Sequence, residues 1–482
     1  MKPYPAFRKH LFLPLASCGL FSGAALAVSE LSIDGGGFQA AQPPITVIQE
    51  QRSNAISLVE DSLVSDSAVM QTGYYNRTAI LQYGNDKLAI LRQPGRFNRA
   101  LIVQVASTDL DFQTIDSRQG GVGATNYLFQ LQTSVDDPDP VAQQFGLLTY
   151  AQAKAVAQNF VDAPEVSRVA AGMLEDITLH FTTILQDRLD RGRYLDCADS
   201  SAAADCASAP FFATLSYGHA ERDSALGTQG YEQDIRSATL GADLRLTPST
   251  RVGLALNLVD ADGDIRHGLG SLDASGYQIG AFGSFTQSQY YLDLMASAGW
   301  IDFSGDRFGG AMKVSTDSDG WSYAARLQTG YFFGGEGMRF GPLLATGYSN
   351  GSVDSYWEKG SMLLRQWIDD QDRERFVASV GAALDRQDLV GGRQLHTYLK
   401  AELERDFGIG REDVVESRFA FAPNALVYTP VDDVGEDTYG KITGGVSLAI
   451  TRQAKVSLAG STFIGSDRLD TYDLYGELSL AF

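Results

Sequence analysis

The residues that most clearly suggest a chemistry in this chain are side-chain amides repeated at a fixed interval. Six positions spaced eleven residues apart carry Gln or, once, Glu: Gln49, Glu60, Gln71, Gln82, Gln93 and Gln104. Amides stacked in neighbouring strands donate and accept hydrogen bonds along the stack, and such ladders stabilise cross-β assemblies. The spacing therefore predicts a stacked β-structure in which Gln lies above Gln.

Further columns keep the same phase and define five consecutive units. The column five residues after each start holds Asn54, Ser65, Asn76, Lys87 and Asn98. The columns seven and nine residues after each start are mostly apolar. In the last three units, Gly stands two residues after the start. Odd offsets fall on one face of a strand, and glycines suit the turns between strands. We therefore predict a short β-solenoid over residues 49–104.

Cys197 and Cys206 are a second pair with a specific chemistry. The eight residues between them are small or acidic, and they form a loop that closes easily. In an oxidising compartment an even pair of cysteines indicates a disulfide. We expect a bridge here; metal binding is the alternative, although no histidine stands near the pair.

Motifs for catalysis are not recognisable in the sequence. Residues 28–148 contain no G-x-S-x-G, H-E-x-x-H or GDSL-type motif and no phosphate-binding loop, and they are few for a catalytic domain. Acidic clusters at residues 260–264 and 432–437 offer oxygen ligands for Ca²⁺ but lack the spacing of an EF-hand loop. We expect no enzyme activity, no cofactor and no metal site.

The composition favours one class of membrane protein. Among 482 residues are 50 Gly, 21 Tyr and 25 Phe, and the net charge is −21. That charge repels phosphate backbones, so nucleic acid is not an expected partner. After the N-terminus no apolar run approaches the roughly 18 residues that a membrane-spanning helix needs. Such a composition is typical of an outer-membrane β-barrel, whose apolar residues alternate with polar ones.

From about residue 210 onward, apolar and polar residues alternate over segments that read as half-exposed strands. Leu254, Leu256 and Leu258, for example, alternate with Ala255 and Asn257. Short turns alternate with longer polar loops, and this pattern distinguishes a barrel from a soluble sandwich. The longer predicted loops include residues 261–273, 305–320, 351–372 and 408–436. We predict a mostly β fold: a closed, antiparallel, 12-stranded barrel over residues 210–482.

The final strand carries the most specific local signal. Tyr472, Leu474, Leu478 and Leu480 occupy one face and lead to a terminal aromatic residue, Phe482. Polar residues such as Asp473, Glu477 and Ser479 lie on the other face. An alternating last strand that ends on an aromatic residue resembles the assembly signal of outer-membrane barrels.

A helical segment precedes the strands. Capping boxes begin at Thr149 and Asp162, and Pro164 would stand in the first turn of a second helix that ends near Arg191. The polar face of this helix carries Arg168, Glu175, Asp176, His180, Gln186, Asp187 and Arg188. A helix of about 28 residues, about 42 Å long, can cross a membrane, but these charges cannot face lipid. We predict that it occupies the polar lumen of the barrel.

The N-terminus predicts export from the cytoplasm. Lys2, Arg8 and Lys9 precede an apolar stretch, and an A-x-A cleavage site ends at Ala27, as in a removable signal peptide. A lipobox that would leave a lipidated Cys18 is the alternative.

A helix followed by a 12-stranded barrel that ends in Phe482 resembles the translocator domain of type V secretion autotransporters, over about two thirds of the chain. The resemblance implies an exported passenger upstream of the helix. It also implies a location in the outer membrane of a Gram-negative bacterium, with the passenger at the cell surface. The implied partners are outer-membrane lipid and the barrel assembly machinery.

The repeat is in turn similar to the curlin repeats of curli amyloid subunits. Residues 93–104 follow the pattern Q-x-G-x-x-N-x-A-x-x-x-Q, and the similarity covers residues 49–104. Gln51 and Ser62 stand where Gly is expected, and Lys87 replaces Asn. The similarity implies adhesion, biofilm formation or amyloid nucleation, with curli-type subunits or host or abiotic surfaces as partners.

These patterns predict four regions: a signal peptide (1–27), a passenger (28–148), a helical linker with a cystine loop (149–209) and the barrel (210–482). The expected function is an autotransporter that exports and displays its own passenger. Alternatives are an outer-membrane pore, an autotransporter whose passenger is only a stalk or plug, and a surface hydrolase, for which the motifs are missing.

Overall fold

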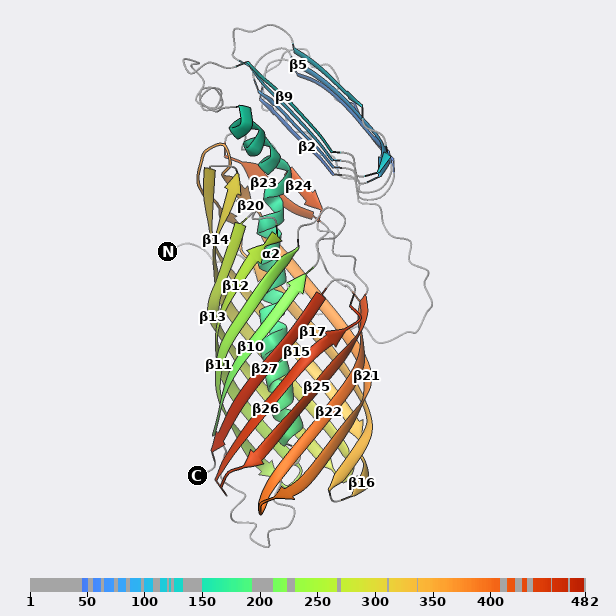
Figure 1. Ribbon diagram of the computed structural model, residues 1–482, viewed down its shortest axis with the longest axis vertical. Coiled ribbons are helices and arrows are strands. Elements are labelled where there is room, and N and C mark those ends of the chain that lie inside the picture. The colour runs from blue at the N-terminus through green and yellow to red at the C-terminus, as the bar shows by residue number, and fades with distance from the viewer. Residues whose placement is uncertain are drawn as a thin grey trace, which may run out of the picture.

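A computed structural model shows a long β-barrel, a helix inside it and two smaller parallel sheets beyond one end (Figure 1). The described residues are 46–50, 55–61, 65–72, 77–83, 87–96, 99–106, 113–118, 121–122, 125–132, 150–192, 211–222, 230–266, 270–309, 312–335, 337–407, 414–420, 427–430, 437–451, 453–466 and 469–480. Side chains are described from residue 169 onward, except at residues 309, 414, 427–430 and 437.

Twelve long strands form the barrel wall. They are β10 (Phe211–Arg222), β11 (Tyr231–Thr247), β12 (Thr250–Ile265), β13 (Gly270–Gln287), β14 (Tyr290–Gly309), β15 (Met312–Tyr331), β17 (Met338–Val353), β21 (Gln371–Val390), β22 (Arg393–Asp406), β25 (Asp437–Ala449), β26 (Ala454–Ile464) and β27 (Leu469–Leu480). Neighbours pair antiparallel, and β27 pairs with β10 to close the ring. The predicted closed, 12-stranded antiparallel barrel is confirmed.

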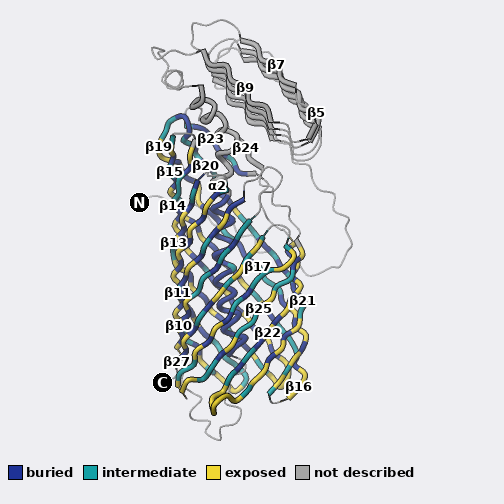
Figure 2. The backbone as a smooth tube through the Cα atoms, viewed as in Figure 1, coloured by how far each residue is buried: buried dark blue, intermediate teal, exposed yellow. Residues whose placement is uncertain are grey.

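The two faces of the wall differ as the alternation predicts. On β12, Leu254 and Leu258 are 68% and 58% exposed, whereas Ala255, Asn257 and Val259 face the interior and are buried. Figure 2 shows this alternation of exposed and buried residues along the strands. Apolar side chains outside and polar ones inside are the arrangement of a barrel whose outer face contacts lipid.

Outward-facing aromatic side chains gather at two heights on this wall. Toward one end, the rings of Tyr277 and Trp300 stack at 5.3 Å, and Trp321 lies in register with Trp300. Toward the other end, the rings of Tyr290 and Tyr331 lie 4.6 Å apart. Aromatic girdles at both membrane interfaces are typical of outer-membrane barrels, so the apolar band between them marks the lipid-spanning zone.

The connections differ at the two ends of the barrel. At one end, which we call the turn end, tight turns at residues 248–249 and 288–289 join consecutive strands, as predicted. At the other, the loop end, residues 353–371 and 407–437 contribute a four-stranded sheet. Its strands are β18 (Tyr356–Trp357), β20 (Gln366–Ile368), β23 (Val414–Phe419) and β24 (Val427–Pro430). Two short strands, β16 (Phe333–Gly335) and β19 (Lys359–Gly360), pair with the wall.

Several predicted loops are wrong at the loop end. Residues 261–273 and 305–320 belong mostly to paired strands, because β12 continues to Ile265 and β14 to Gly309. Asp260 and Asp262 therefore lie on a strand rather than in a loop. Above the lipid the outer face meets water, so polar residues replace the apolar column by which a strand is recognised.

One helix, α2 (Tyr150–Gly192), runs through the lumen, which confirms the predicted position (Figure 1). It is a single helix of 43 residues, so the prediction of a separate helix beginning at Pro164 is wrong. A proline removes only one backbone hydrogen bond from the ladder, and the helix continues on both sides. Among the described residues, no helix combines the length and apolar character needed to cross a membrane.

Two parallel sheets precede the helix. One contains β1 (Thr46–Glu50), β3 (Ser65–Thr72), β5 (Lys87–Arg96) and β7 (Gln113–Arg118), with β8 (Gly121–Val122) paired to β5. The other contains β2 (Ala55–Asp61), β4 (Arg77–Tyr83), β6 (Arg99–Ala106) and β9 (Thr125–Gln132).

The pairing register relates the sheets to the repeat. Gln49 is opposite Gln71, which is opposite Gln93. In the second sheet the matching column is Glu60, Gln82, Gln104 and Gln130. Consecutive eleven-residue units thus alternate between the sheets, and the pairing joins units 22 residues apart. The paired strands also continue past residue 104, where the repeat becomes irregular.

Candidate functional site in the barrel lumen

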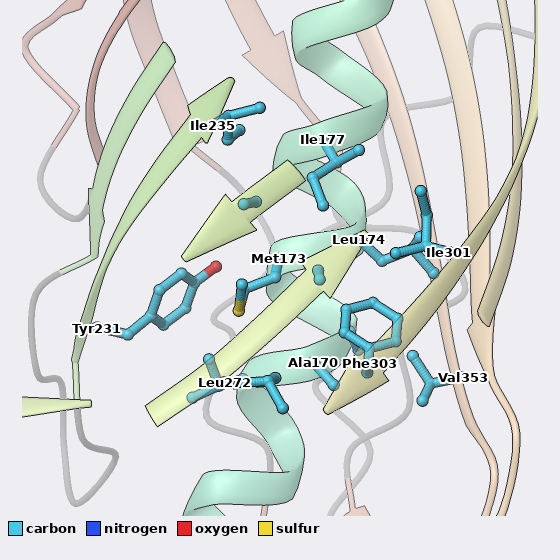
Figure 3. Packing of buried hydrophobic residues seen from close by; sticks show 14 of the residues in the cluster. Ala170, Met173, Leu174, Ile177, Tyr231, Ile235, Leu272, Ile301, Phe303 and Val353 are labelled. Atoms are coloured by element: carbon cyan, nitrogen blue, oxygen red, sulfur yellow. The ribbon is translucent and has the colours of Figure 1, made fainter. Parts of the chain in front are cut away.

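The apolar side of α2 packs against one side of the wall. Met173, Leu174 and Ile177 point into a cluster that includes Ile301 and Phe303, as Figure 3 shows. Farther along α2, Phe181, Leu185 and Leu189 form a second cluster with wall residues of β10, β12, β13 and β14. The helix is therefore seated against β10–β15 rather than suspended in the centre of the lumen.

A wall glycine accommodates this packing. A Cβ at Gly280 on β13 would lie 2.6 Å from Cδ1 of Leu185 and 3.1 Å from the tip of the Phe181 ring. A Cβ atom is not found as close as 2.6 Å to another atom, so a larger residue here would force the Leu185 side chain out of its packed position. Gly280 thus provides the hollow into which a helix side chain fits.

Near the turn end, two arginines of α2 meet carboxylates of the wall. We call Arg188, Arg191, Glu477 and Asp243 the arginine cluster. Arg188 donates to Oε1 of Glu477 at 2.6 Å and to Oδ2 of Asp243 at 2.8 Å. Arg191 donates to Oε2 of Glu477 at 2.9 Å. None of the four side chains is more than 3% exposed. Breaking such a pair from one side leaves an uncompensated buried charge and costs about 3–5 kcal/mol.

Other polar contacts attach the same turns of α2 to the opposite wall. Asp187 is paired with Arg191 and accepts a hydrogen bond from the hydroxyl of Tyr398 on β22. Asp190 lies 2.5 Å from Nζ of Lys400, also on β22. The helix is therefore held by charged groups from both sides of the barrel at this height.

A second charged group holds α2 near the loop end. Asp176 accepts hydrogen bonds from Arg222 at 2.7 Å and from the hydroxyl of Tyr231 at 2.8 Å. Glu175 pairs with Arg373 and lies 3.5 Å from Arg375, both on β21. Here the helix supplies acids and the wall supplies bases, the reverse of the arginine cluster.

His180 connects α2 to the two strands that close the barrel. Its Nδ1 lies 2.6 Å from Oδ1 of Asp473 on β27, and its Nε2 lies 2.9 Å from Oγ of Ser216 on β10. One imidazole ring thus makes a hydrogen bond to each of the two closing strands. A Cβ at Gly218 would lie 2.8 Å from both Nδ1 and Oδ1, so this glycine leaves room for the pair.

A polar cavity separates the other side of α2 from β15, β17, β21, β22 and β25. Thr182, Thr183 and Gln186 line its helix side. On the wall side, Glu402 pairs with Arg326 at 2.9 Å, a bond made within the wall itself. The arrangement positions a helix along the barrel axis and leaves polar space on one side of it.

The predicted site residues are placed as follows. On β27, Tyr472, Leu474 and Leu478 point outward, with 43%, 53% and 44% exposure, and Leu480 is half-buried. The ladder glutamines and Glu60 lie in paired strands. Several predicted features lie outside the described residues: the signal peptide, Cys18, Asn54, Asn76, Asn98, Cys197, Cys206 and Phe482.

Sequence reasoning missed the arginine cluster. The sequence places Arg188 on the polar face of the helix and Glu477 on the polar face of the last strand. It does not indicate their contact, because the two residues are 289 positions apart. One signal was present: Arg188 and Arg191 stand three apart on one helix face, opposite strands whose inward faces carry Asp243 and Glu477.

Comparisons with known proteins concern mainly the barrel. The Autotransporter beta-domain family matches residues 211–461. Among solved structures, the translocator domain of autotransporter NalP from Neisseria meningitidis is 14% identical and covers 64% of this chain and 98% of its own, with a TM-score of 0.49. The beta domain of the Bordetella autotransporter BrkA is 16% identical and covers 57% of this chain and 100% of its own, with a TM-score of 0.45.

A curated relative from Pseudomonas putida carries the description "Uncharacterized protein in trpE-trpG intergenic region" and is 26% identical over 215 residues. The match covers 41% of this chain and 35% of the relative, so the chain spans about a third of the relative's length. The solved structures concern the fold alone. Because the family match covers more than half of the 482 residues, the chain belongs to the Autotransporter beta-domain family, outer-membrane barrels of type V secretion in Gram-negative bacteria.

Proposed function

We propose that this chain exports its own N-terminal segment through the outer membrane and displays it at the cell surface. The carrying observation is the path of α2. Its N-terminal end emerges at the loop end, where the two parallel sheets lie, and its C-terminal end lies near the turn end, where β10 begins (Figure 1). A chain that threads the lumen in this way connects the two sides of the membrane.

The contacts of α2 favour a chain that threads the whole lumen over an N-terminal segment that only plugs a pore. The helix makes ion pairs near both ends of its lumenal part, with Arg222 at the loop end and Glu477 at the turn end. Charged side chains that would be costly in lipid are thereby satisfied within the barrel. The family's translocator barrels are not themselves enzymes, so the specific activity belongs to the displayed segment.

For that segment, residues 28–148, we propose adhesion, biofilm formation or amyloid nucleation. The matching of Gln49 with Gln71 and Gln93 in successive parallel strands supports a ladder of amides. One described sheet ends on β1, a strand paired on one side only, whereas β2, the corresponding edge of the other sheet, lies against β24. An edge like that of β1 is a template for another strand, so curli-type subunits or host or abiotic surfaces are the proposed partners.

Protease shaving of intact cells tests the display. Antibodies against residues 49–104 should bind intact cells, and external protease should abolish this signal while the barrel survives. A passenger cleaved after export would appear in the medium instead. Protection of residues 49–104 in intact cells, with digestion only after lysis, would contradict display and favour the plug alternative.

A further inference from the structure

The arginine cluster lies at the place where the barrel closes. Glu477 is on β27 and accepts from Arg188, Arg191 and, at 3.3 Å, from Thr214 on β10. β27 and β10 are the last and first strands, and Asp243 is on the next strand, β11. One helix turn is therefore bound to three adjacent strands around the closure.

The spacing of the arginines makes these contacts specific for one position of α2 along the barrel axis, which we call its height; outward means toward the loop end and inward toward the turn end. Arg188 and Arg191 rise about 4.5 Å apart on the same helix face, so that one carboxylate reaches both. If α2 moved outward by one turn, about 5.4 Å, Gly192 would replace Arg188 and bring no side chain. If it moved inward by one turn, Ile184 and Asp187 would replace the two arginines. Either shift removes both arginines from Glu477, which is strongly unfavourable for a buried carboxylate, and leaves Asp243 only its longer pair with Arg251 at 3.7 Å.

The end of the helix adds a steric element. A Cβ at Gly192 would lie 1.8 Å from Nη1 of Arg251 on β12, so a larger residue at this height would require the Arg251 side chain to move. A cation near the C-terminal turn also interacts favourably with the helix dipole.

The pair works only in helical conformation. Arg96 and Arg99 have the same spacing, but they lie at the end of β5 and the start of β6. Residues three apart in an extended chain face opposite sides and lie about 10 Å apart, beyond the reach of one carboxylate. An extended segment in transit therefore does not engage Glu477 as α2 does.

We propose that Glu477 and Asp243 form a stop that ends export by capturing Arg188 and Arg191. The inference rests on the proposed export function and adds to it the residues that decide where the chain halts. The two carboxylates act as positioning residues, because they hold the helix at one height rather than move the chain.

Paired cysteines can measure that height. In full-length protein carrying Cys197→Ser and Cys206→Ser, Leu185→Cys with Gly280→Cys reports the observed position, because Leu185 adjoins Gly280. Leu189→Cys with Gly280→Cys, in a background with Leu185→Ala that removes the collision at position 280, reports a helix exported one turn further. Each pair is combined with Glu477→Gln and Asp243→Asn together. The matched control is Asp385→Asn, a buried wall carboxylate bound to Arg339 and His396 of neighbouring strands.

We expect a disulfide between positions 185 and 280 in the protein that keeps Glu477 and Asp243, and also in the Asp385→Asn control. In the double variant this cross-link should fall severalfold and the 189–280 cross-link should rise. Unchanged cross-linking in the double variant, with residues 49–104 still displayed, would overturn the stop alone. Loss of display in every strain with intact cross-links would instead overturn the export function. If the double variant does not assemble, Arg188→Gln with Arg191→Gln tests the same contact without altering the wall, and the same two outcomes decide.

Discussion

His180 on the lumenal helix and Asp473 on the last strand form a hydrogen bond of 2.6 Å across 293 residues of sequence. The same imidazole reaches Ser216 on the first strand, so one helix residue connects both strands of the closure. We therefore expect helix seating and barrel closure to be energetically coupled.

The first prediction concerns this coupling. His180→Ala should lower the stability of the assembled barrel by about 1–3 kcal/mol, because Asp473 and Ser216 both lose a partner inside the lumen. The measurement is the temperature at which the folded band disappears on semi-denaturing gels. His180→Gln, which keeps a donor and an acceptor, should recover part of the loss. Equal melting of His180→Ala and wild type would exclude the coupling.

The second prediction concerns the hollow at Gly280. Gly280→Val should reduce the yield of folded barrel, because the added atoms collide with Leu185 and Phe181. Shortening the opposing residue by Leu185→Ala should restore part of the yield in the double variant. Gly335→Ala is the control, since no atom lies within 4 Å of its Cβ position. Absence of rescue would mean that the collision is not with Leu185.

The third prediction concerns the C-terminal assembly signal. Deletion of Phe482 should impair insertion, while wild-type protein should migrate differently before and after boiling. Leu478→Ser, on the lipid-facing side of the same strand, should have a smaller effect because it leaves the terminal residue in place. Wild-type protein that fractionates as soluble and shows no heat-dependent shift would refute the assembly signal.

The fourth prediction concerns the cysteines. Cys197 and Cys206 should resist thiol labelling in the oxidised, denatured protein and become reactive after reduction. Two labelled thiols without reduction would disprove the bridge.

The fifth prediction concerns the amide columns. A peptide of residues 71–104 should accelerate amyloid-dye-positive aggregation of itself or of a curlin subunit, and Gln82→Ala with Gln93→Ala should slow it. Gln82 is central in the column of one sheet, whereas Gln93 continues the column of the other, so the pair weakens both. A scrambled peptide of equal composition is the control. A monomeric, non-seeding peptide, together with unchanged adhesion after deletion of residues 49–104, would favour a simple stalk.

The sequence predicts the barrel wall well where lipid and lumen impose opposite chemistry on its two faces. Leu254 and Leu258 mark such a strand, whereas its continuation through Asp262 and Asp264 has no apolar column, because water lies outside it, and therefore resembles a loop. Pro164 has the sequence signals of a helix start, although the helix continues through it.

The lumen site was predicted only in outline. A charged helix too polar for lipid requires a polar lumen, and that much follows from composition. The partner of each charge depends on strand register and on the height of the helix. These are set by the whole ring, so the contact of Arg188 with Glu477 could not be read from local sequence.

The parallel register of the two N-terminal sheets has a consequence for how this protein can change length. Gln49 opposes Gln71 and Glu60 opposes Gln82, so insertion or loss of 22 residues adds or removes one layer in each sheet and leaves every other pairing intact. A change of eleven residues would instead exchange the two sheets for all following strands. The N-terminal sheets can thus gain or lose whole layers, each about 4.8 Å thick, without any alteration of the barrel.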